Sequence, residues 1–395
     1  MLLDPPAGWH PDWFQSSASK KIFTALGDNC VRFVGGCVRD SLLGRDVADI
    51  DLATTHEPMR TTELLEAVGA KVVPTGLAHG TVTVILDNQS FEVTSLRRDV
   101  STDGRHATVA FTEDWHEDAR RRDFTINALY ATADGKIFDP FGGLEDLKNR
   151  RVRFIGSAVD RIKEDALRIF RFFRFSARFG ASLDTEGLAA CSLRAADAKN
   201  LSRERVRDEL LKLLAIPDPR KFLREMQAIR VLPHVGDAPP DLINLNRLVA
   251  TEMNNDCFSA AETRLANCYA KHGAKEIGKA FRLSKKQQHF ISDVREAGQN
   301  LDTDTSIRPK IYRLGEKAVE DALASFAGDQ RSKFLYEVNS WESPIFPVSG
   351  ADLMSAGIDP TPELGKRLKI LEQTWIDSDF KMTRNSLMAL VGPGS

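Results

Sequence analysis

The sequence lacks most features that mark a secreted, membrane-spanning or disulfide-rich protein. It has only 5 cysteines in 395 residues, none of them in a Cys-x-x-Cys pair, and their spacing does not suggest disulfides. No apolar run is long enough to cross a bilayer, and the first residues, "MLLDPPAGWHPDWF", lack the basic and apolar regions of a signal peptide. We therefore expect a reduced, cytoplasmic protein.

The chain also has little net charge, but that charge is unevenly distributed. The formal net charge is −2, which by itself argues against a nucleic-acid-binding protein. Residues 148–230, however, contain 20 Lys and Arg against 11 Asp and Glu, a local charge of +9, so the rest of the chain carries −11. A basic segment of this kind fits a phosphate backbone as partner, and it fits a set of solvated helix faces equally well.

Strand and helix patterns alternate up to about residue 140. The predicted strands cover residues 30–34, 49–54, 81–86 and 91–96. The turn-forming sequence "DNQS" between the last two predicts a hairpin. Helical patterns fill residues 38–43 and 58–69, whereas 97–120 is polar and weakly periodic and predicts a long loop. This part of the chain is expected to be a small α/β domain with a mixed sheet.

From about residue 148 the pattern becomes helical. The spacing predicts one helix over 160–180, stopped by Gly180, and another over 201–214, capped by Ser202. Few strand signals follow before the C-terminus, and a chain of this length is expected to form two to four domains. The predicted fold class is α+β, with an α/β head followed by an all-helical remainder.

A glycine turn and two acidic residues suggest a site for a nucleotide and metal ions. Gly35 and Gly36 lie between a predicted strand and a helix, where backbone N–H groups can approach phosphate oxygens, and Arg39 follows with a forked cation. No Walker A sequence or Gly-x-Gly-x-x-Gly accompanies them, so the turn alone is weak evidence.

Asp49 and Asp51 strengthen this interpretation. Alternate residues of a strand share a face, so the two carboxylates project together while Ile50 and Leu52 enter the core. Paired carboxylates repel each other unless a cation lies between them, and hard oxygen ligands beside a polyphosphate favour Mg²⁺. Glu92, on a neighbouring predicted strand, is a candidate third catalytic carboxylate or an edge charge that faces water.

Five segments, in order, resemble the class II, bacterial-type tRNA nucleotidyltransferases of the tRNA nucleotidyltransferase and poly(A) polymerase family, closest to its CCA-adding enzymes. They are "GGCVRDSLLGRDVADIDLAT" (35–54), "RRDFTINALY" (121–130), "DPFGGLEDL" (139–147), "EDALRIFRFFRF" (164–175) and "RERVRDELLKLL" (203–214). Residues 353–376 are similar to that family's C-terminal part more loosely. The resemblance implies a seahorse-shaped protein: a nucleotidyltransferase head (1–145), a helical neck (146–230), a body (231–340) and a tail (341–395) that holds tRNA.

The resemblance also implies roles for individual residues. Asp49 and Asp51 correspond to the metal-binding pair. The nucleotide-binding residues that it implies in the head are Gly35, Gly36, Arg39, Arg122, Asp123 and Asn127. Without the family pattern, the arginines near residue 122 would be interpreted as partners of nearby acids.

In the neck, the resemblance assigns Asp165 and Arg168 to reading the incoming base. Cytosine and adenine each place an amino donor beside a ring-nitrogen acceptor, which suits an aspartate and an arginine, whereas uracil and guanine present the reversed pattern. On one continuous helix the two residues would be neighbours, and a simple ion pair is the alternative.

The same helix carries further arginines and a run of phenylalanines. Arg171 and Arg174 match further nucleotide contacts, although helical geometry predicts that Arg174 lies nearly opposite Asp165. The four phenylalanines of 170–175 are expected in the core. Glu204 and Arg205 are expected to brace the base-reading helix.

The predicted function is addition of C, C and A to the tRNA 3′ end from CTP and ATP by two-metal nucleotidyl transfer with Mg²⁺, releasing pyrophosphate. The expected partners are the tRNA acceptor arm and 3′ end, and the sequence does not give the oligomeric state. The alternatives are a bacterial poly(A) polymerase, an enzyme that adds only CC or only A, a small-molecule nucleotidyltransferase and a non-catalytic tRNA-binding homologue. The last predicts loss of the metal carboxylates, and both are present.

Overall fold

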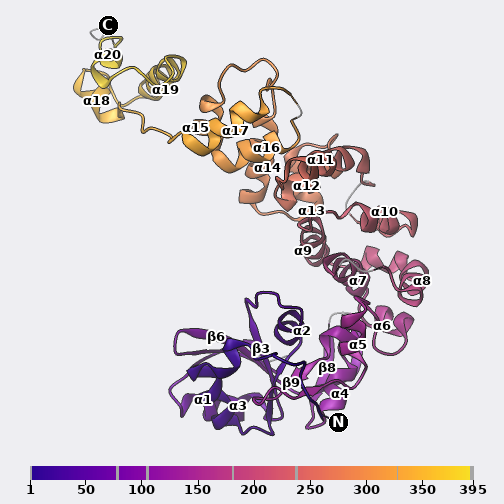
Figure 1. Ribbon diagram of the computed structural model, residues 1–395. Helices are drawn as coiled ribbons and strands as arrows, with labels where there is room; N and C mark the ends of the chain where they lie inside the picture. The colour runs from indigo at the N-terminus through magenta and orange to yellow at the C-terminus, as the bar shows by residue number, and fades with distance from the viewer. Residues whose placement is uncertain are drawn as a thin grey trace. The chain divides into compact units, whose positions relative to one another are not determined.

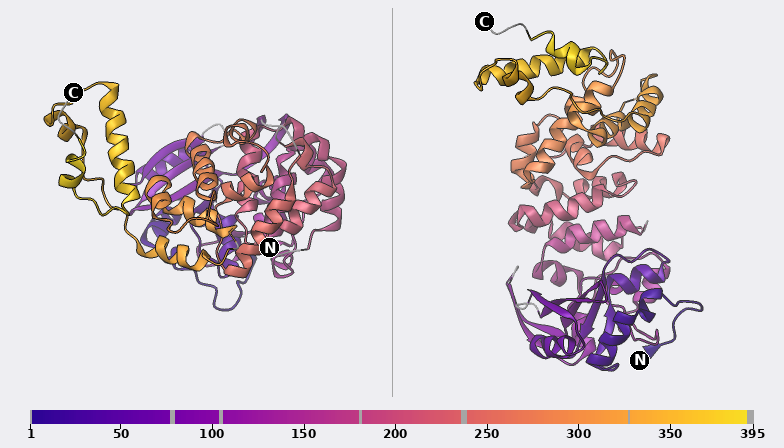
Figure 2. Two further views of the ribbon diagram at one scale, coloured as in Figure 1. Left: turned by 90° about the horizontal axis from the view of Figure 1, so that it is seen from above. Right: turned by 90° about the vertical axis from the view of Figure 1, so that its left-hand side faces the viewer.

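The computed structural model forms two compact units, Met1–Pro239 and Pro240–Ser395 (Figures 1 and 2). The described residues are 2–76, 80–103, 106–179, 182–235, 239–326 and 328–391. The four-part division into head, neck, body and tail is finer than these two units and stays a prediction. No helix among the described residues combines the length and the apolar character needed to cross a bilayer.

An eight-stranded mixed sheet forms the centre of the first part of unit 1. Its strand order is β1-β10-β9-β2-β3-β6-β5-β4. The strands are β1 (Leu2–Leu3), β2 (Val31–Val34), β3 (Ile50–Thr54), β4 (Lys71–Gly76), β5 (Thr81–Leu86), β6 (Gln89–Ser95), β9 (Tyr130–Ala131) and β10 (Ile137–Phe138). The β3–β6 pair is parallel and the other described pairs are antiparallel, which confirms the mixed sheet.

The strands predicted near the glycine turn form because they bury apolar side chains, and the hairpin forms because its turn has suitable residues. In β2 and β3, Phe33 and Leu52 are fully buried, whereas Ile50 is only half-buried because it begins its strand. The β5–β6 hairpin turns at Asp87 and Asn88, whose φ angles of 49° and 60° belong to the left-handed region that tight hairpins favour. Gln89 and Ser90, predicted as turn residues, belong to β6. Helices α1 (Ser17–Leu26), α2 (Gly36–Leu42) and α3 (Pro58–Glu66) connect these strands.

The prediction of a long loop over 97–120 is wrong. The segment forms an antiparallel pair, β7 (Arg97–Asp103) with β8 (His106–Phe111), followed by helix α4 (Trp115–Arg120). The register joins Arg97 to Phe111 and shifts between Asp99 and Ser101. Polar residues on both strands hide the alternation, because a two-stranded ribbon has no core of its own to bury an apolar face.

The prediction of one helix over 160–180 is also wrong. The segment divides into α6 (Ala158–Glu164) and α7 (Leu167–Arg178), and the predicted stop, Gly180, lies outside the described residues. Asp165 at the break has extended backbone angles, φ −151° and ψ 105°, and its Oδ1 accepts the backbone N–H of Leu167 at 3.1 Å. The aspartate therefore caps the start of α7 instead of continuing α6.

The remaining elements of unit 1 are short or helical. They are η1 (Asp12–Gln15), η3 (Thr125–Asn127), α5 (Gly143–Lys148), α8 (Thr185–Leu193), η4 (Ala195–Asn200), α9 (Arg203–Leu214), α10 (Arg220–Ala228) and η5 (Leu232–His234). Helix α9 confirms the prediction for 201–214, and the Ser202 hydroxyl accepts the N–H of Arg205 at its start. The phenylalanines of α7 are buried, as predicted.

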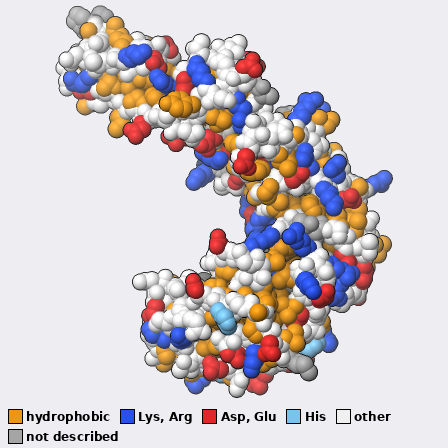
Figure 3. All heavy atoms as spheres, viewed as in Figure 1, with side chains coloured by type: hydrophobic (Ala, Val, Ile, Leu, Met, Phe, Trp, Pro, Cys, Tyr) orange, Lys and Arg blue, Asp and Glu red, His pale blue; other side chains and the backbone are white. Residues whose placement is uncertain are grey.

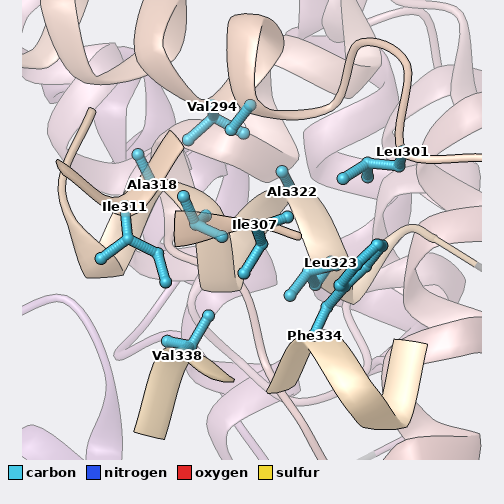
Figure 4. Packing of buried hydrophobic residues seen from close by; sticks show 11 residues of the cluster. Val294, Leu301, Ile307, Ile311, Ala318, Ala322, Leu323, Phe334 and Val338 are labelled. Carbon is cyan, nitrogen blue, oxygen red and sulfur yellow. The ribbon is translucent and has the colours of Figure 1, made fainter. Parts of the chain in front are cut away.

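Every regular element described in unit 2 is a helix. The helices are α11 (Leu242–Asn255), α12 (Ala261–Cys268), α13 (Ala274–Phe281), α14 (Lys285–Ala297), α15 (Arg308–Leu314), α16 (Glu316–Ala324), α17 (Arg331–Ser340), α18 (Gly350–Ser355), α19 (Pro362–Asp377) and α20 (Arg384–Met388). Side chains of α14 to α17 form one apolar cluster, in which Ile307, Leu323 and Phe334 are fully buried (Figure 4). A second cluster, around Leu353, Trp375 and Leu387, holds α18 to α20 together.

We predict that Gly143→Ala destabilises the protein. A Cβ at Gly143, the first residue of α5, would collide with the carbonyl oxygen of Thr125 and lie 2.9 Å from its carbon. We expect this overpacking to lower the free energy of unfolding by roughly 2 kcal/mol. Gly365→Ala in α19 is the control, because its Cβ meets no atom within 4 Å and alanine favours the helix by roughly 1 kcal/mol. Thermal unfolding should show a lower midpoint for the first variant and an unchanged or higher one for the second; equal midpoints would contradict the packing.

Candidate active site

One pocket in unit 1, with a volume of about 650 Å³, gathers almost all of the predicted site residues. It is lined by Gly35, Gly36, Arg39, Asp49, Asp51, Arg122, Asp123, Asn127, Asp165, Leu167, Arg168, Arg171, Arg174, Phe175, Arg205 and Lys212. Of the predicted set, only Glu92 does not line it. Lys and Arg side chains also gather on the surface over α7 and α9 (Figure 3).

The glycine turn lies close to an arginine from a distant part of the chain. Gly35 has a φ of 72°, and a Cβ there would be 3.4 Å from Nη1 of Arg122 and 3.6 Å from the carbonyl oxygen of Asn127. Its N–H donates to the carbonyl of Leu129 at 2.9 Å. The backbone conformation therefore favours glycine at position 35, and Arg122 lies within van der Waals contact of the turn.

Asp51 lies close to two other acidic residues, Asp49 and Glu92. Among the described residues, no arginine forms an ion pair with Asp51. It pairs in register with Glu92 of the neighbouring strand, and burial raises its pKa to about 6, with further contributions from Glu92 and Asp49. Arg122 and Arg39 oppose the shift without cancelling it. The Cys37 thiol donates to the backbone carbonyl of Asp51 at 3.5 Å and helps to hold this part of β3 in place.

Asp49 and Asp51 suit a divalent cation whose remaining ligands come from a substrate. Asp49 is exposed and Asp51 is half-buried, so both remain accessible from the pocket. Among the described residues, no group of three or more His, Cys, Asp or Glu forms a metal site by itself. A hard cation here would need further oxygen ligands, and phosphate oxygens are suitable ones. Glu92 is exposed and adds negative charge beside Asp51, and its catalytic role stays a prediction.

Each of the five arginines that line the pocket and belong to the predicted set has a carboxylate partner. The ion pairs are Arg39–Asp40 (2.8 Å), Arg122–Asp118 (3.2 Å), Arg168–Glu164 (2.5 Å), Arg171–Asp123 (2.6 Å) and Arg174–Glu209 (2.5 Å). All five carboxylate partners are buried or partly buried. The partners offset the mutual repulsion of the cations and fix their orientation.

A continuous chain of hydrogen bonds joins Arg39 of α2 to Arg171 of α7. The Asn127 side chain accepts from Arg39 and donates to Oδ1 of Asp123 at 2.9 Å. Oδ2 of Asp123 accepts from Nε of Arg171 at 2.6 Å. Burial would raise the pKa of Asp123, but Arg171 and Asn127 hold it below its ordinary value. Asp123 and Asn127 thus line the pocket while also holding its arginines.

The base-reading pair is arranged differently from the prediction. Because the helix breaks at Asp165, this residue and Arg168 are not neighbours on one helical face, and the alternative of a simple ion pair between them does not form either. Oδ2 of Asp165 accepts from Arg205 at 2.7 Å. Arg168 instead donates to Glu164 and to the carbonyl oxygens of Arg161 and Arg121.

The same break corrects the expected position of Arg174. The rotation from Asp165 does not apply to a helix that begins at Leu167, and Arg174 lines the pocket beside Arg171. Its guanidinium stacks on the ring of Phe175 at 3.9 Å from the centroid. Phe175 is therefore a core residue, as predicted, and also part of the pocket wall.

Sequence reasoning missed most of the carboxylates that hold the arginines. Asp40 comes one residue after Arg39 and Asp118 comes four residues before Arg122, and this closeness in sequence was the available signal. Glu209 is 35 residues from Arg174, and no local pattern indicates that pair. Arg205 braces Asp165 as predicted, whereas Glu204 is exposed and Glu209 contacts the α7 arginines instead.

Comparison with known proteins gives consistent matches. A family model described as "Poly A polymerase head domain" matches residues 31–153, and one described as "Probable RNA and SrmB- binding site of polymerase A" matches residues 182–237. The chain is 34% identical over 377 residues to the mitochondrial CCA tRNA nucleotidyltransferase 1 of Mus musculus, covering 91% of this chain and 86% of that protein. It is 31% identical over 379 residues to the CCA-adding enzyme of Streptococcus gordonii, covering 91% and 92%.

A solved structure resembles the fold over nearly its whole length. The CCA-adding enzyme of Bacillus stearothermophilus in complex with CTP has a TM-score of 0.72 and 26% sequence identity, covering 94% of both chains. This likeness confirms the α+β fold class predicted from the sequence.

The raised pKa of Asp51 leads to a prediction about stability. A carboxyl group whose folded pKa is above its unfolded value weakens the fold as pH rises from the unfolded value towards about 6, and this loss is complete at neutral pH. In metal-free buffer at pH 7.5, Asp51→Asn should therefore raise the thermal midpoint, and the gain should vanish near pH 4. Asp46→Asn, at an exposed acid of the loop that precedes β3, is the control. A lower midpoint for Asp51→Asn at pH 7.5 would show that no unfavourable charge exists there.

Proposed function

The chain belongs to the tRNA nucleotidyltransferase and poly(A) polymerase family, and we propose that its unit 1 pocket adds C, C and A to the 3′ end of tRNA. The nucleotides come from CTP and ATP, and pyrophosphate is released. The observation that supports this best is that one pocket contains a carboxylate pair, four paired arginines (Arg39, Arg122, Arg171 and Arg174) and the Asp165–Arg168 set. A small-molecule nucleotidyltransferase would need only the first two.

Enzymes of this family use divalent metals, and we propose Mg²⁺ here. Asp49 and Asp51 would hold two Mg²⁺ ions, as their accessibility and the raised pKa of Asp51 support. When bound there, the ions would lower the pKa of the attacking 3′-hydroxyl and stabilise the leaving pyrophosphate. Below pH 6, protonation of Asp51 would compete with the metal, so activity should fall in that range.

The arginines bind the triphosphate. Arg39 and Arg122 lie beside the glycine turn and near enough to Asp51 to influence its pKa, so a phosphate between them would also be close to the metal ligands. Asp40 and Asp118 form ion pairs with the two guanidinium groups, so the orientation of both groups is fixed before the substrate binds. Arg171 and Arg174 add positive charge from α7.

Asp165 and Arg168 read the base. An amino group of cytosine or adenine would donate to the Asp165 carboxylate, and Arg168 would donate to the adjacent ring nitrogen. Uracil and guanine would place a carbonyl against the carboxylate and leave buried polar groups unpaired. The ion pairs with Arg205 and Glu164 orient the Asp165 and Arg168 side chains before a base binds.

The relatives favour CCA addition over synthesis of a poly(A) tail. The curated relatives that match 91% of this chain are named as CCA-adding enzymes, although the matched head model carries the name of poly(A) polymerase. The partners are tRNA, CTP and ATP. We infer that the helices of the neck, body and tail, including the region of residues 182–237 that matches an RNA-binding model, hold the tRNA acceptor arm. We also infer that residues 97–120 correspond to the family's flexible loop, which is linked to addition of the terminal A.

A nucleotide-incorporation assay tests this function. With tRNA that lacks CCA, the wild-type protein should add three residues from CTP and ATP and none from UTP or GTP. The variant Asp49→Ala/Asp51→Ala should lose all transfer because the metal ligands are removed, and Asp165→Ala should add UTP as well while its KM for CTP changes less than about threefold. Asp46→Ala is the control for the metal variant. A long A tail, or an unchanged base choice for Asp165→Ala, would contradict the proposal.

A further inference from the structure

Asp118 is a buried carboxylate of α4 that lies outside the pocket and contacts one of its arginines. Its side chain is 1% exposed. Oδ1 accepts from Nε and Nη2 of Arg121 at 2.9 and 2.7 Å and from the backbone N–H of Arg97 at 3.4 Å. Oδ2 accepts from Arg122 and from the hydroxyl of Tyr130 at 2.6 Å. The carboxylate is therefore fixed from four directions.

Arg122 uses one edge of its guanidinium for this contact. Nε and Nη2 donate to Oδ2 of Asp118 at 3.3 and 3.2 Å, and Nε also donates to the Tyr130 hydroxyl at 3.0 Å. Nη1 points the other way: it is the atom nearest to the position of a Cβ on Gly35, and its bond to the Asn127 carbonyl is long, at 3.5 Å. The nitrogen with the weakest protein partner is thus the one that lies beside the glycine turn.

This arrangement restricts a side chain that is otherwise flexible. A free arginine loses considerable rotamer freedom when it binds a ligand, and a prior ion pair removes that loss from the binding step. The ring of Tyr130 lies 5.2 Å from the Arg122 guanidinium and further limits its position. Burial would raise the pKa of Asp118, but Arg122, Arg121 and Tyr130 lower it to about 2, so the carboxylate stays ionised wherever the protein is folded and active.

We propose that Asp118 is a positioning residue for the nucleotide: together with Tyr130, it holds Arg122 so that Nη1 faces the triphosphate beside Gly35. The inference rests on the proposed function, because it assumes that a nucleoside triphosphate occupies the pocket. Asp118 itself does not touch the substrate. Since the contact concerns phosphate and not base, it acts equally on CTP and ATP.

Steady-state kinetics of two variants and one control test the proposal. Asp118→Asn keeps the shape of the side chain but loses the charge that fixes Arg122, and Tyr130→Phe removes only the hydroxyl. We expect the KM for CTP and ATP to rise about tenfold in the first and about threefold in the second, with kcat changed less than about threefold. Rejection of UTP should stay as in the wild type.

Asp184→Asn is the matched control. Asp184 is also a buried carboxylate of unit 1 and is bound by Arg151 at 2.6 Å, but neither residue lines the pocket. A merely structural effect would appear as a lower thermal midpoint in both aspartate variants with no specific rise in KM. If Asp118→Asn does not fold, Tyr130→Phe decides by the same criterion.

The outcomes separate this inference from the proposed function. If the wild type adds no nucleotide to tRNA, the proposed function fails and the positioning role fails with it. If the wild type is active and the KM values of Asp118→Asn and Tyr130→Phe do not differ from that of Asp184→Asn, only the positioning role is overturned.

Discussion

The site depends on holding a cluster of arginines in one pocket against their mutual repulsion. Charges of one sign in a partly buried space are unfavourable unless opposite charges lie close by. Asp40, Asp118, Asp123, Glu164 and Glu209 supply those charges, and they come from α2, α4, the segment before η3, α6 and α9. The pocket therefore forms only when the sheet and the neck helices have packed together. Its positive charge is arranged before any substrate enters.

The acidic side of the pocket has the opposite character. Asp51 is half-buried beside Asp49 and Glu92, and its raised pKa shows that the folded protein does not fully compensate this charge. The pocket arginines suit phosphate groups, whereas Asp49 and Asp51 suit a cation, so the site favours a ligand that brings both. A metal-bound nucleoside triphosphate meets both requirements at once, and we propose that Asp165 and Arg168 add selection among bases.

The parts of the fold that follow from local patterns could be predicted. The strands around Phe33 and Leu52 have a clear apolar face, and the Asp87–Asn88 turn has residues that adopt its left-handed backbone. The pairing of β7 with β8 could not be predicted because the polar strands of this two-stranded ribbon do not alternate between an apolar and a polar face. The break at Asp165 was missed because its cause is a single side-chain hydrogen bond to Leu167, which periodicity does not reveal.

The site residues could be predicted by resemblance and the order of motifs, but their partners could not. Twelve of the thirteen predicted residues line the pocket, whereas Glu92 only borders its acidic side. Glu209 approaches Arg174 through helix packing across 35 positions of sequence, and the Arg171–Asp123 pair spans 48. Such contacts arise from tertiary structure, so the orientation of each arginine could not be predicted from the sequence.

A crystal structure of the protein with CTP and Mg²⁺ would test the central claim most directly. The account predicts the triphosphate between the glycine turn, Arg39 and Arg122, with the metal on Asp49 and Asp51 and the cytosine amino group on Asp165. A nucleotide bound outside this pocket, or a triphosphate that contacts neither Arg39 nor Arg122, would contradict it.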